Sequence, residues 1–274
     1  MFRLTRPRGR SIPVLVEVPH ASVALPDEVR PTLLVSAEAI RRDADSYVDE
    51  LYRDAPAQGA ALLTACASRY VVDLNRDEAD VDAWAVRGAD DRVGEHPRGV
   101  IWRETGEGRA ALRSPLAREE FEARLARYYR PYHQCLAHEL AALRARHAHV
   151  LLVAAHSMPS TARAARGDKR VRLADVVPGT RGFTTADRAL IDVVDLYFRA
   201  AGLSVRHDEP YRGGATTARW GRPSEGFHAI QVELNRALYM DEATGDPRPD
   251  GVAWITSLCA GLVARLGEAL AARR

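Results

Sequence analysis

One short stretch constrains the fold and chemistry of this chain more than any other. Residues 229–236 read Ala-Ile-Gln-Val-Glu-Leu-Asn-Arg, a short apolar run that predicts a buried strand. Glu233 lies inside this run. A buried carboxylate is costly unless it is paired, neutralised or close to a cation. We therefore treat Glu233 as a candidate functional residue; the alternative is a structural ion pair with Arg236 or another arginine.

Two histidines follow apolar runs in the same way. Ile12–Val18 predicts a first strand that ends just before His20, and His149–Ala155 predicts the clearest buried strand, which ends at His156. Open α/β sheets bind ligands beyond the carboxyl ends of their strands. The two imidazoles are therefore expected to converge above the sheet, where they could bind a metal. The alternative for His20 is a turn histidine that bonds only to backbone.

Carboxylates and an arginine occur near two further predicted elements. Val35–Tyr52 predicts a helix that carries Asp43 and Asp45, and helical i, i+2 spacing puts these two on different faces. At most one of them would then be a metal ligand; the alternative is that both pair with neighbouring arginines. Tyr70–Val72 predicts a strand that leads into Asp73-Leu-Asn-Arg-Asp77, where Asn75 and Arg76 are suited to bind a carboxylate. The alternative is a capped turn with surface ion pairs.

The remaining pattern alternates strands with helices and so predicts an α/β protein with a mostly parallel sheet in one domain, residues 1–274. The other expected elements are a strand at Ala60–Ala65, an irregular segment at Asp80–Ser114, a long helix at Pro115–Arg146, a loop at Asp175–Phe183, a helix capped by Thr184 or Thr185 and reaching Ala201, a strand at Leu203–Arg206, and a last helix at Val252–Ala271. Between the last two, Gly213 and Gly214 form a turn that lets backbone amides approach a ligand.

Composition argues against several classes of protein. The 274 residues carry a formal net charge of +2, and no basic run is interleaved with aromatic residues as a nucleic-acid groove requires. Cys66, Cys135 and Cys259 are widely spaced and form no CxxC pair, which argues against a disulfide framework or a cysteine-rich zinc site. No stretch reaches transmembrane length by this reading. We expect a cytoplasmic protein with no nucleic-acid or membrane partner.

These pieces together predict metal-assisted hydrolysis of an amide. Two imidazoles and one carboxylate, from Asp43 or Asp45, with an open fourth position make a catalytic zinc site. Zinc lowers the pKa of a bound water to about 7 and polarises a carbonyl. Glu233 would be the general base, and Arg76 would hold a substrate carboxylate or stabilise the oxyanion. The same ligands suit cobalt, iron or manganese nearly as well.

Several ordered sequence blocks carry a resemblance to a known family. They are Val-Pro-His-Ala-Ser at 18–22, Asp-Ala-Asp-Ser-Tyr-Val-Asp-Glu-Leu-Tyr at 43–52, Ser-Arg-Tyr-Val-Val-Asp-Leu-Asn-Arg-Asp at 68–77, Tyr-Tyr-Arg-Pro-Tyr-His at 128–133, Ala-His-Ser-Met-Pro at 155–159, Pro-Tyr-Arg-Gly-Gly at 210–214, and His-Ala-Ile-Gln-Val-Glu-Leu-Asn-Arg-Ala-Leu-Tyr-Met-Asp-Glu at 228–242. Through most of its length the chain resembles the N-formylglutamate amidohydrolases, also called N-formylglutamate deformylases.

The resemblance implies a fold and a set of metal ligands. The family is similar to zinc carboxypeptidases and aspartoacylase-like enzymes, which implies a three-layer α/β fold with a mixed, mostly parallel sheet between helices. By that analogy His20 and His156 hold the metal and Glu233 is the base. Carboxypeptidases take a glutamate three residues after the first histidine, but Val23 occupies that position here. The third ligand must come from elsewhere, and we choose Asp45, with Asp43 second.

The resemblance also implies a small-molecule N-acyl amino acid substrate. The implied reaction converts N-formyl-L-glutamate and water to formate and L-glutamate, the closing step of one route of histidine degradation. The residues expected to bind this substrate are Asn75, Arg76, Arg181, Tyr211, Gly213 and Gly214.

Two departures from the family pattern leave other functions open. Ser22 replaces a common glycine, and His207-Asp208-Glu209 stands where an asparagine is common. A related amidohydrolase for another N-acyl amino acid is therefore an alternative. The alternative from another class is a metal-free small-acid binding protein, against which the histidine pair and Glu233 argue. The sequence leaves the oligomeric state open.

Overall fold

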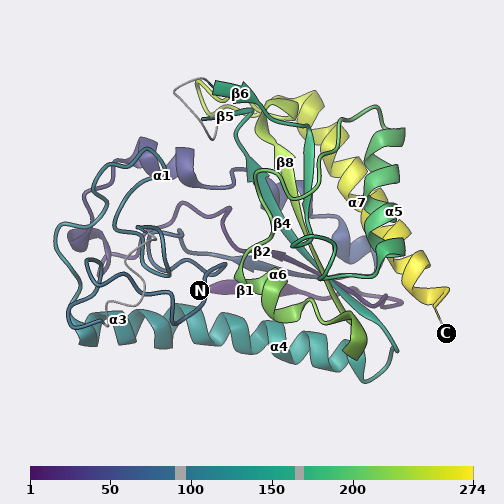
Figure 1. Ribbon diagram of the computed structural model, residues 1–274, viewed down its shortest axis with the longest axis horizontal. Coiled ribbons are helices and arrows are strands. Elements are labelled where there is room, and N and C mark those ends of the chain that lie inside the picture. The colour runs from purple at the N-terminus through teal and green to yellow at the C-terminus, as the bar shows by residue number, and fades with distance from the viewer. Residues whose placement is uncertain (90–96, 164–169, 274) are drawn as a thin grey trace. The chain divides into compact units, whose positions relative to one another are not determined.

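A six-stranded sheet forms the centre of the fold in the computed structural model, which describes residues 1–89, 97–163 and 170–273 (Figure 1). In sheet order the strands are β1 (Phe2–Thr5), β3 (Ala61–Ala65), β2 (Val14–Val18), β4 (Val150–Met158), β8 (Phe227–Asn235) and β7 (Val176–Gly179). β4 pairs in parallel with β2 and β8, and β7 is antiparallel to β8. The predicted mixed sheet is confirmed. A separate antiparallel pair, β5 (Thr161–Arg163) with β6 (Arg170–Arg172), was not predicted.

The chain folds into two compact units, each built from several segments. The first consists of Met1–Arg3, Pro19–Ser46 and Thr64–His138, and the second of Leu4–Val18, Tyr47–Leu63 and Glu139–Arg274. The first unit contains α1 (Ala37–Asp43), the 3-10 turn η1 (Arg30–Thr32), α3 (Arg118–Arg124), the π-helical turn η4 (Leu125–Tyr129) and the start of α4 (Arg130–Arg144). The second contains α2 (Val48–Leu51), α5 (Arg188–Ala200), α6 (Ala215–Trp220), α7 (Pro249–Ala271) and the 3-10 turns η2 (Ala55–Gln58), η5 (Pro223–Glu225) and η6 (Arg236–Leu238).

The second unit buries its two central strands β2 and β4 completely. All five residues of β2 and all nine of β4 are buried. Parallel strands covered on both faces are apolar along their whole length, which is why these runs were recognisable in the sequence. In Figure 1, α5 and α7 lie side by side, and they are in contact; α6 contacts β4 and β8.

The last helix, α7, contradicts the expectation that no stretch of the chain reaches transmembrane length. α7 has 23 residues and a mean hydropathy of 1.3 over its most apolar window, so it is long and apolar enough to cross a membrane by those two criteria. The apolar residues have another use within the second unit. The helix contacts α5, α2 and β2, and its side chains at Ile255, Cys259, Leu262 and Leu266 are buried.

The helix predicted at Val35–Tyr52 is interrupted. α1 ends at Asp43, Ala44 is extended, and Tyr47 has a left-handed φ of 67° before α2 begins. The cause is a long-range backbone hydrogen bond, in which the N–H of Asp45 donates to the carbonyl of His20 at 3.0 Å. Asp45 therefore lies outside any helix. Helical i, i+2 spacing does not determine how its side chain is oriented relative to that of Asp43.

Four other expected elements differ. Tyr70–Val72 is a turn rather than a strand, since the N–H of Val71 donates to the carbonyl of Ser68 at 2.9 Å. Leu203–Arg206 forms only an isolated bridge, from Val205 to Val176. The expected loop Asp175–Phe183 contains β7. The expected helix Pro115–Arg146 begins at Arg118, ends at Arg144 and includes the turn η4.

Two element ends were also misplaced. α5 has Asp187 as its N-cap instead of Thr184 or Thr185, because the hydroxyl of Thr185 donates to the carbonyl of Ala229 at 2.7 Å. β4 continues to Met158, so His156 lies inside the strand. The described part of Asp80–Ser114 has only isolated bridges, as expected; residues 90–96 of it lie outside the described residues.

A chain of hydrogen bonds joins the start of β4 to the start of β8. His228 Nδ1 accepts the backbone N–H of Asp187 at 3.3 Å, so the ring proton of neutral His228 lies on Nε2 and donates to His149 Nδ1, 3.0 Å away. Asp187 also pairs with Arg273. By type and spacing, His149, Asp187 and His228 could also hold a metal ion. Their hydrogen bonds already account for this arrangement. Burial lowers the pKa of His228 to about 4.

This low pKa predicts a specific acid sensitivity. Between about pH 4 and 6.5 the unfolded chain binds a proton at residue 228 that the folded protein does not, so the free energy of unfolding falls as the pH is lowered through this window. A pKa difference of about 2.5 corresponds to roughly 3 kcal/mol. We predict that His228→Gln removes this contribution to the pH dependence of the free energy of unfolding, as measured by urea denaturation between about pH 4 and 6.5. The exposed His138→Gln is the control, and an unchanged slope in His228→Gln would contradict the assignment.

Candidate metal centre

Asp73 and Asp45 contact the two ring nitrogens of His20. The side chain of His20 is buried, with Nε2 2.8 Å from Asp73 Oδ1 and Nδ1 3.6 Å from Asp45 Oδ2. Burial and the charge of Arg69 lower the pKa of His20, but the two carboxylates outweigh them, and the pKa is raised above its ordinary value. The environment of this histidine is therefore built to attract positive charge.

Asp73 is fully buried and surrounded by donors. Its Oδ1 also accepts the backbone N–H of Asn75 at 2.9 Å. Its Oδ2 accepts Arg69 Nη2 at 2.9 Å, Arg69 Nε at 3.2 Å and Trp102 Nε1 at 2.9 Å. Burial raises the pKa of Asp73, but His20 and Arg69 lower it well below its usual range. The carboxylate is therefore ionised. Asp73 belongs to the polar run Asp73–Asp77 singled out in the sequence, but only Asn75 and Arg76 of that run were predicted to have a role.

Asp43 has its own partners. Its carboxylate accepts the hydroxyl of Tyr70 and, at 2.9 Å, the backbone N–H of Gly106. These contacts connect α1 to the irregular segment of the first unit. The structure thus gives Asp43 and Asp45 different surroundings, with Asp45 beside His20.

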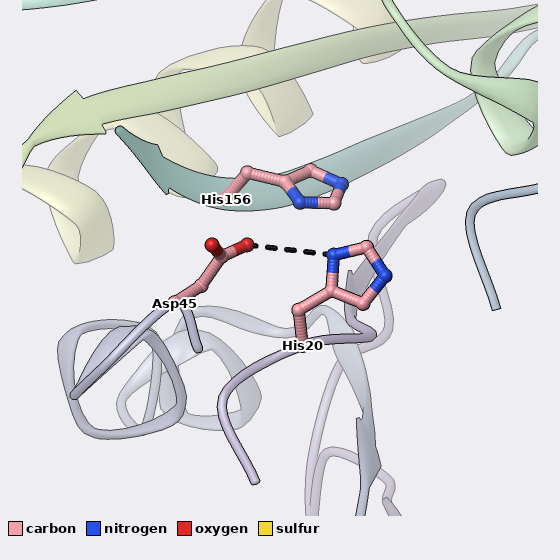
Figure 2. Close-up of side chains that lie close together, drawn as sticks. All are labelled: His20, Asp45 and His156. Carbon is pink, nitrogen blue, oxygen red and sulfur yellow. Dashed lines mark ion pairs between the residues drawn. The ribbon is translucent and has the colours of Figure 1, made fainter. Parts of the chain in front are cut away.

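His20, Asp45 and His156 lie close together, and Figure 2 shows the ion pair between the first two. Each offers one ligand atom, all three atoms lie within 4.8 Å of one another, and all three residues are buried. Two imidazoles and a carboxylate are a donor set that suits a divalent metal. The arrangement is compatible with a metal ion.

Glu233 is the register partner of His156. The two residues are opposite each other in the parallel pairing of β4 with β8, so their side chains leave the sheet on the same face. Glu233 is buried, and Gln231 Nε2 donates to its Oε1 at 2.8 Å. Gln231 Oε1 accepts the backbone N–H of Gly214 at 2.9 Å. Gln231 thus links the candidate base to the Gly-Gly turn. This contact was not predicted, although i, i+2 spacing in a strand places both side chains on one face.

Ser157 is one partner of Arg236. Its Nε donates to Ser157 Oγ at 3.0 Å, and both residues are buried. Ser157 follows His156 on β4, and successive strand residues point to opposite faces. The Ser157 side chain therefore leaves β4 on the face opposite to that of His156.

Three of the expected substrate-binding residues come together in the second unit. Arg181 Nη1 donates to the carbonyl of Gly213 at 3.0 Å, and Gly214 follows with its N–H on Gln231. Gly213 has a φ of 97°, which favours glycine. A Cβ at Gly179 would lie 2.6 Å from Gly213 N, so this turn also packs tightly against β7. Tyr211 is half-buried two residues earlier.

The other two expected substrate-binding residues belong to the first unit. Asn75 is buried, and its N–H bonds to Asp73 as described above. The side chain of Arg76 is half-buried, its N–H donates to the Asp73 carbonyl at 3.3 Å, and its carbonyl accepts the Tyr129 hydroxyl at 2.8 Å. Backbone bonds thus hold the segment that carries both side chains.

The fold and this group of side chains define an α/β protein with a candidate metal centre at a sheet edge. The model of the N-formylglutamate amidohydrolase family matches residues 12–240. The chain belongs to this family, which confirms the resemblance found in the sequence.

Individual proteins and solved structures are similar to this chain over most of its length. The chain is 34% identical over 238 residues to an N-formylglutamate deformylase of Pseudomonas aeruginosa and 33% identical over 238 residues to one of Pseudomonas putida, with 86% of this chain and 84% of each relative covered. The crystal structure of an N-formylglutamate amidohydrolase from Ralstonia eutropha superimposes with a TM-score of 0.88 at 30% identity, covering 99% of this chain and 98% of that one. A gene product of Agrobacterium tumefaciens shares the fold, with a TM-score of 0.73 at 20% identity, covering 99% and 95%.

The grouping of His20 with Asp45 and His156 generates a test of metal binding. We predict that His20→Ala and His156→Ala each weaken zinc affinity by more than about 100-fold, because losing a ligand costs more than losing one of its hydrogen-bond partners. Competition with a chromophoric chelator measures the affinity. His138→Ala, an exposed histidine on α4, should bind zinc like the wild type. Wild-type affinity in His20→Ala would place the ion elsewhere.

Proposed function

We propose that this protein is a metal-dependent amidohydrolase that converts N-formyl-L-glutamate and water to formate and L-glutamate. The observation that carries the proposal is the group of His20, Asp45 and His156 with Glu233 as the register partner of His156. The deformylases named above, which are more than 30% identical over most of both chains, support the substrate. The reaction would close a route of histidine degradation.

The proposed metal site uses only residues whose donor chemistry fits. His20, Asp45 and His156 would hold one divalent ion, with zinc as the first choice, and such an ion supplies a Lewis acid and lowers the pKa of bound water. The buried positions of the three side chains support this choice, because a desolvated charge cluster gains most from a cation.

Glu233 is proposed as the general base. Its carboxylate would take a proton from the attacking water, whose oxygen bonds to the formyl carbon, and would deliver that proton to the nitrogen as the C–N bond breaks. Gln231 Nε2 holds the Oε1 of this carboxylate, which fixes its orientation. A base held in this way loses little freedom when the substrate binds.

The substrate is proposed to meet two sets of side chains. Arg76, with Asn75 beside it, would hold a substrate carboxylate through its planar guanidinium or stabilise the oxyanion. Arg181 and Tyr211, together with the backbone of Gly213 and Gly214, would line the rest of the binding site. The hydrogen bond between Arg181 and Gly213 and the link from Gly214 through Gln231 support this grouping.

One observation keeps a second substrate class open. Asp208 lies in the segment that departs from the family pattern, and its carboxylate accepts the N–H groups of Thr180 at 2.7 Å and Gly182 at 2.8 Å. These contacts shape the loop that carries Arg181. A changed loop would suit another N-acyl amino acid.

The domain organisation and the location of the enzyme are also part of the proposal. We propose one catalytic domain, since the family match at 12–240 extends through both compact units. None of Cys66, Cys135 and Cys259 forms a disulfide, which supports the reducing cytoplasm as its location. A small-molecule substrate is its proposed partner.

A substrate panel tests the proposed reaction. We predict that the zinc-loaded protein releases formate from N-formyl-L-glutamate faster than it cleaves N-acetyl- or N-succinyl-L-glutamate, as measured by coupled assays of formate and glutamate. Preference for one of the other acyl groups would keep the mechanism and change the substrate. Binding of these acids without any hydrolysis would instead favour the binding-protein alternative.

A single substitution tests the role of Glu233. Glu233→Gln keeps the size of the side chain but cannot take a proton, so we predict a kcat lower by about 10²- to 10⁴-fold with metal content unchanged. Glu139→Gln is the matched control, because Glu139 is a buried carboxylate on α4 that pairs with Arg6. Full activity in Glu233→Gln would rule out Glu233 as the base.

A further inference from the structure

We propose that Asp73 is a positioning residue that fixes His20 with its ring proton on Nε2 and so presents Nδ1 to the metal. The inference rests on the proposed function for the identity of the metal site. It adds which atom of His20 is the ligand and which residue selects it. The contacts that select the tautomer all lie within the first compact unit.

His20 is the donor in its hydrogen bond with Asp73. Both oxygens of Asp73 accept N–H groups, from Asn75 at Oδ1 and from Arg69 and Trp102 at Oδ2, so the carboxylate acts only as an acceptor. Asp73 Oδ1 lies 2.8 Å from His20 Nε2, so Nε2 must carry the proton. When the imidazole is neutral, the lone pair is then on Nδ1, the nitrogen that faces Asp45 Oδ2 at 3.6 Å. A divalent cation needs such a lone pair, and Asp45 supplies a carboxylate on the same side.

Neighbouring donors hold Asp73 in place. Arg69 and Trp102 give three N–H donors to Oδ2, and the Arg69 guanidinium also lies over the Trp102 ring at 4.3 Å. Asn75 gives its backbone N–H to Oδ1. The carboxylate is fully buried, and its donors approach from several directions, so it cannot turn away from His20. Carboxylates that bond to a ligating histidine in this way set its tautomer and basicity.

An amide in place of the Asp73 carboxylate is expected to reverse the hydrogen bond to His20. In Asp73→Asn the single oxygen is best placed toward the three donors of Arg69 and Trp102. The NH₂ group then faces His20 Nε2, which must become an acceptor. The ring proton moves to Nδ1 and blocks the proposed ligand atom. Asp73→Asn is therefore expected to reverse the tautomer while changing the side-chain volume very little.

The experiment combines tautomer and affinity measurements. In metal-free protein labelled with ¹⁵N-histidine, at a pH where His20 is neutral, we expect long-range ¹H–¹⁵N spectra to show the Nε2–H form in the wild type and the Nδ1–H form in Asp73→Asn. The His20 signals are identified by their loss in His20→Gln. Zinc affinity, measured by chelator competition, should fall about 10- to 100-fold in Asp73→Asn.

A buried aspartate elsewhere in the same unit provides the control. Asp82 is also buried, pairs with Arg103 and accepts the N–H of Trp84 at 2.7 Å. Asp82→Asn should leave both the His20 tautomer and zinc affinity at wild-type values, which separates positioning from a general effect on the fold.

Two outcomes would overturn the inference. One is an Nδ1–H form of His20 in the wild type, which requires no variant to fold. The other is wild-type zinc affinity in folded Asp73→Asn. Failure of the proposed function is distinguishable, because then the wild type itself would bind no zinc while the tautomer result would still report on Asp73.

Discussion

The parallel pairing of β4 with β2 and with β8 is the interaction on which the candidate site depends. These pairings set Glu17 opposite Ala154 and His156 opposite Glu233. A slip of one residue in either register would send the side chains to the other face of the sheet. The strands are buried along nearly their whole length, so the apolar core fixes this register. Ordinary hydrophobic packing thus determines where the polar groups lie.

Burying these polar groups creates a second requirement. Glu233 and His20 each have a partner that is itself held by the backbone or by other side chains. Glu233 receives the amide of Gln231, whose oxygen is held by the N–H of Gly214. His20 bonds to Asp73, which is itself held by Arg69 and Trp102. Both arrangements fix the orientation of a side chain of the proposed site, and preorganised groups of this kind favour catalysis.

Much of the sheet was predictable because it depends on local pattern. The apolar runs that became β2, β3, β4 and β8 are short, continuous and rich in Val, Leu and Ala, and they were assigned within a few residues. β7 was missed because its sequence, Val-Val-Pro-Gly, carries turn signals, and only pairing with β8 makes it a strand. Tyr70–Val72 has strand-forming residues, yet Ser68 closes a turn there.

The site was predictable only in part for the same reason. His20, His156 and Glu233 were singled out because each lies in or directly after a strand. The position of Asp45 depends on a hydrogen bond to His20 that interrupts a helix with neither glycine nor proline at the break. Asp73 bonds to His20 across 53 positions of the chain, and no local pattern in one sequence shows such a contact. The i, i+2 spacing of Gln231 and Glu233 indicates only that the two side chains share a face of the strand. Long-range contacts, more than propensity, therefore complete the site.

We propose that hydrolysis of the formyl amide needs a metal held by His20, Asp45 and His156. The most direct measurement is formate release from N-formyl-L-glutamate by protein stripped with a chelator, dialysed and then titrated with zinc. We expect that stripping abolishes formate release and that activity returns in proportion to zinc, reaching its maximum at one ion per chain. Undiminished release from protein shown to be free of metal would contradict it.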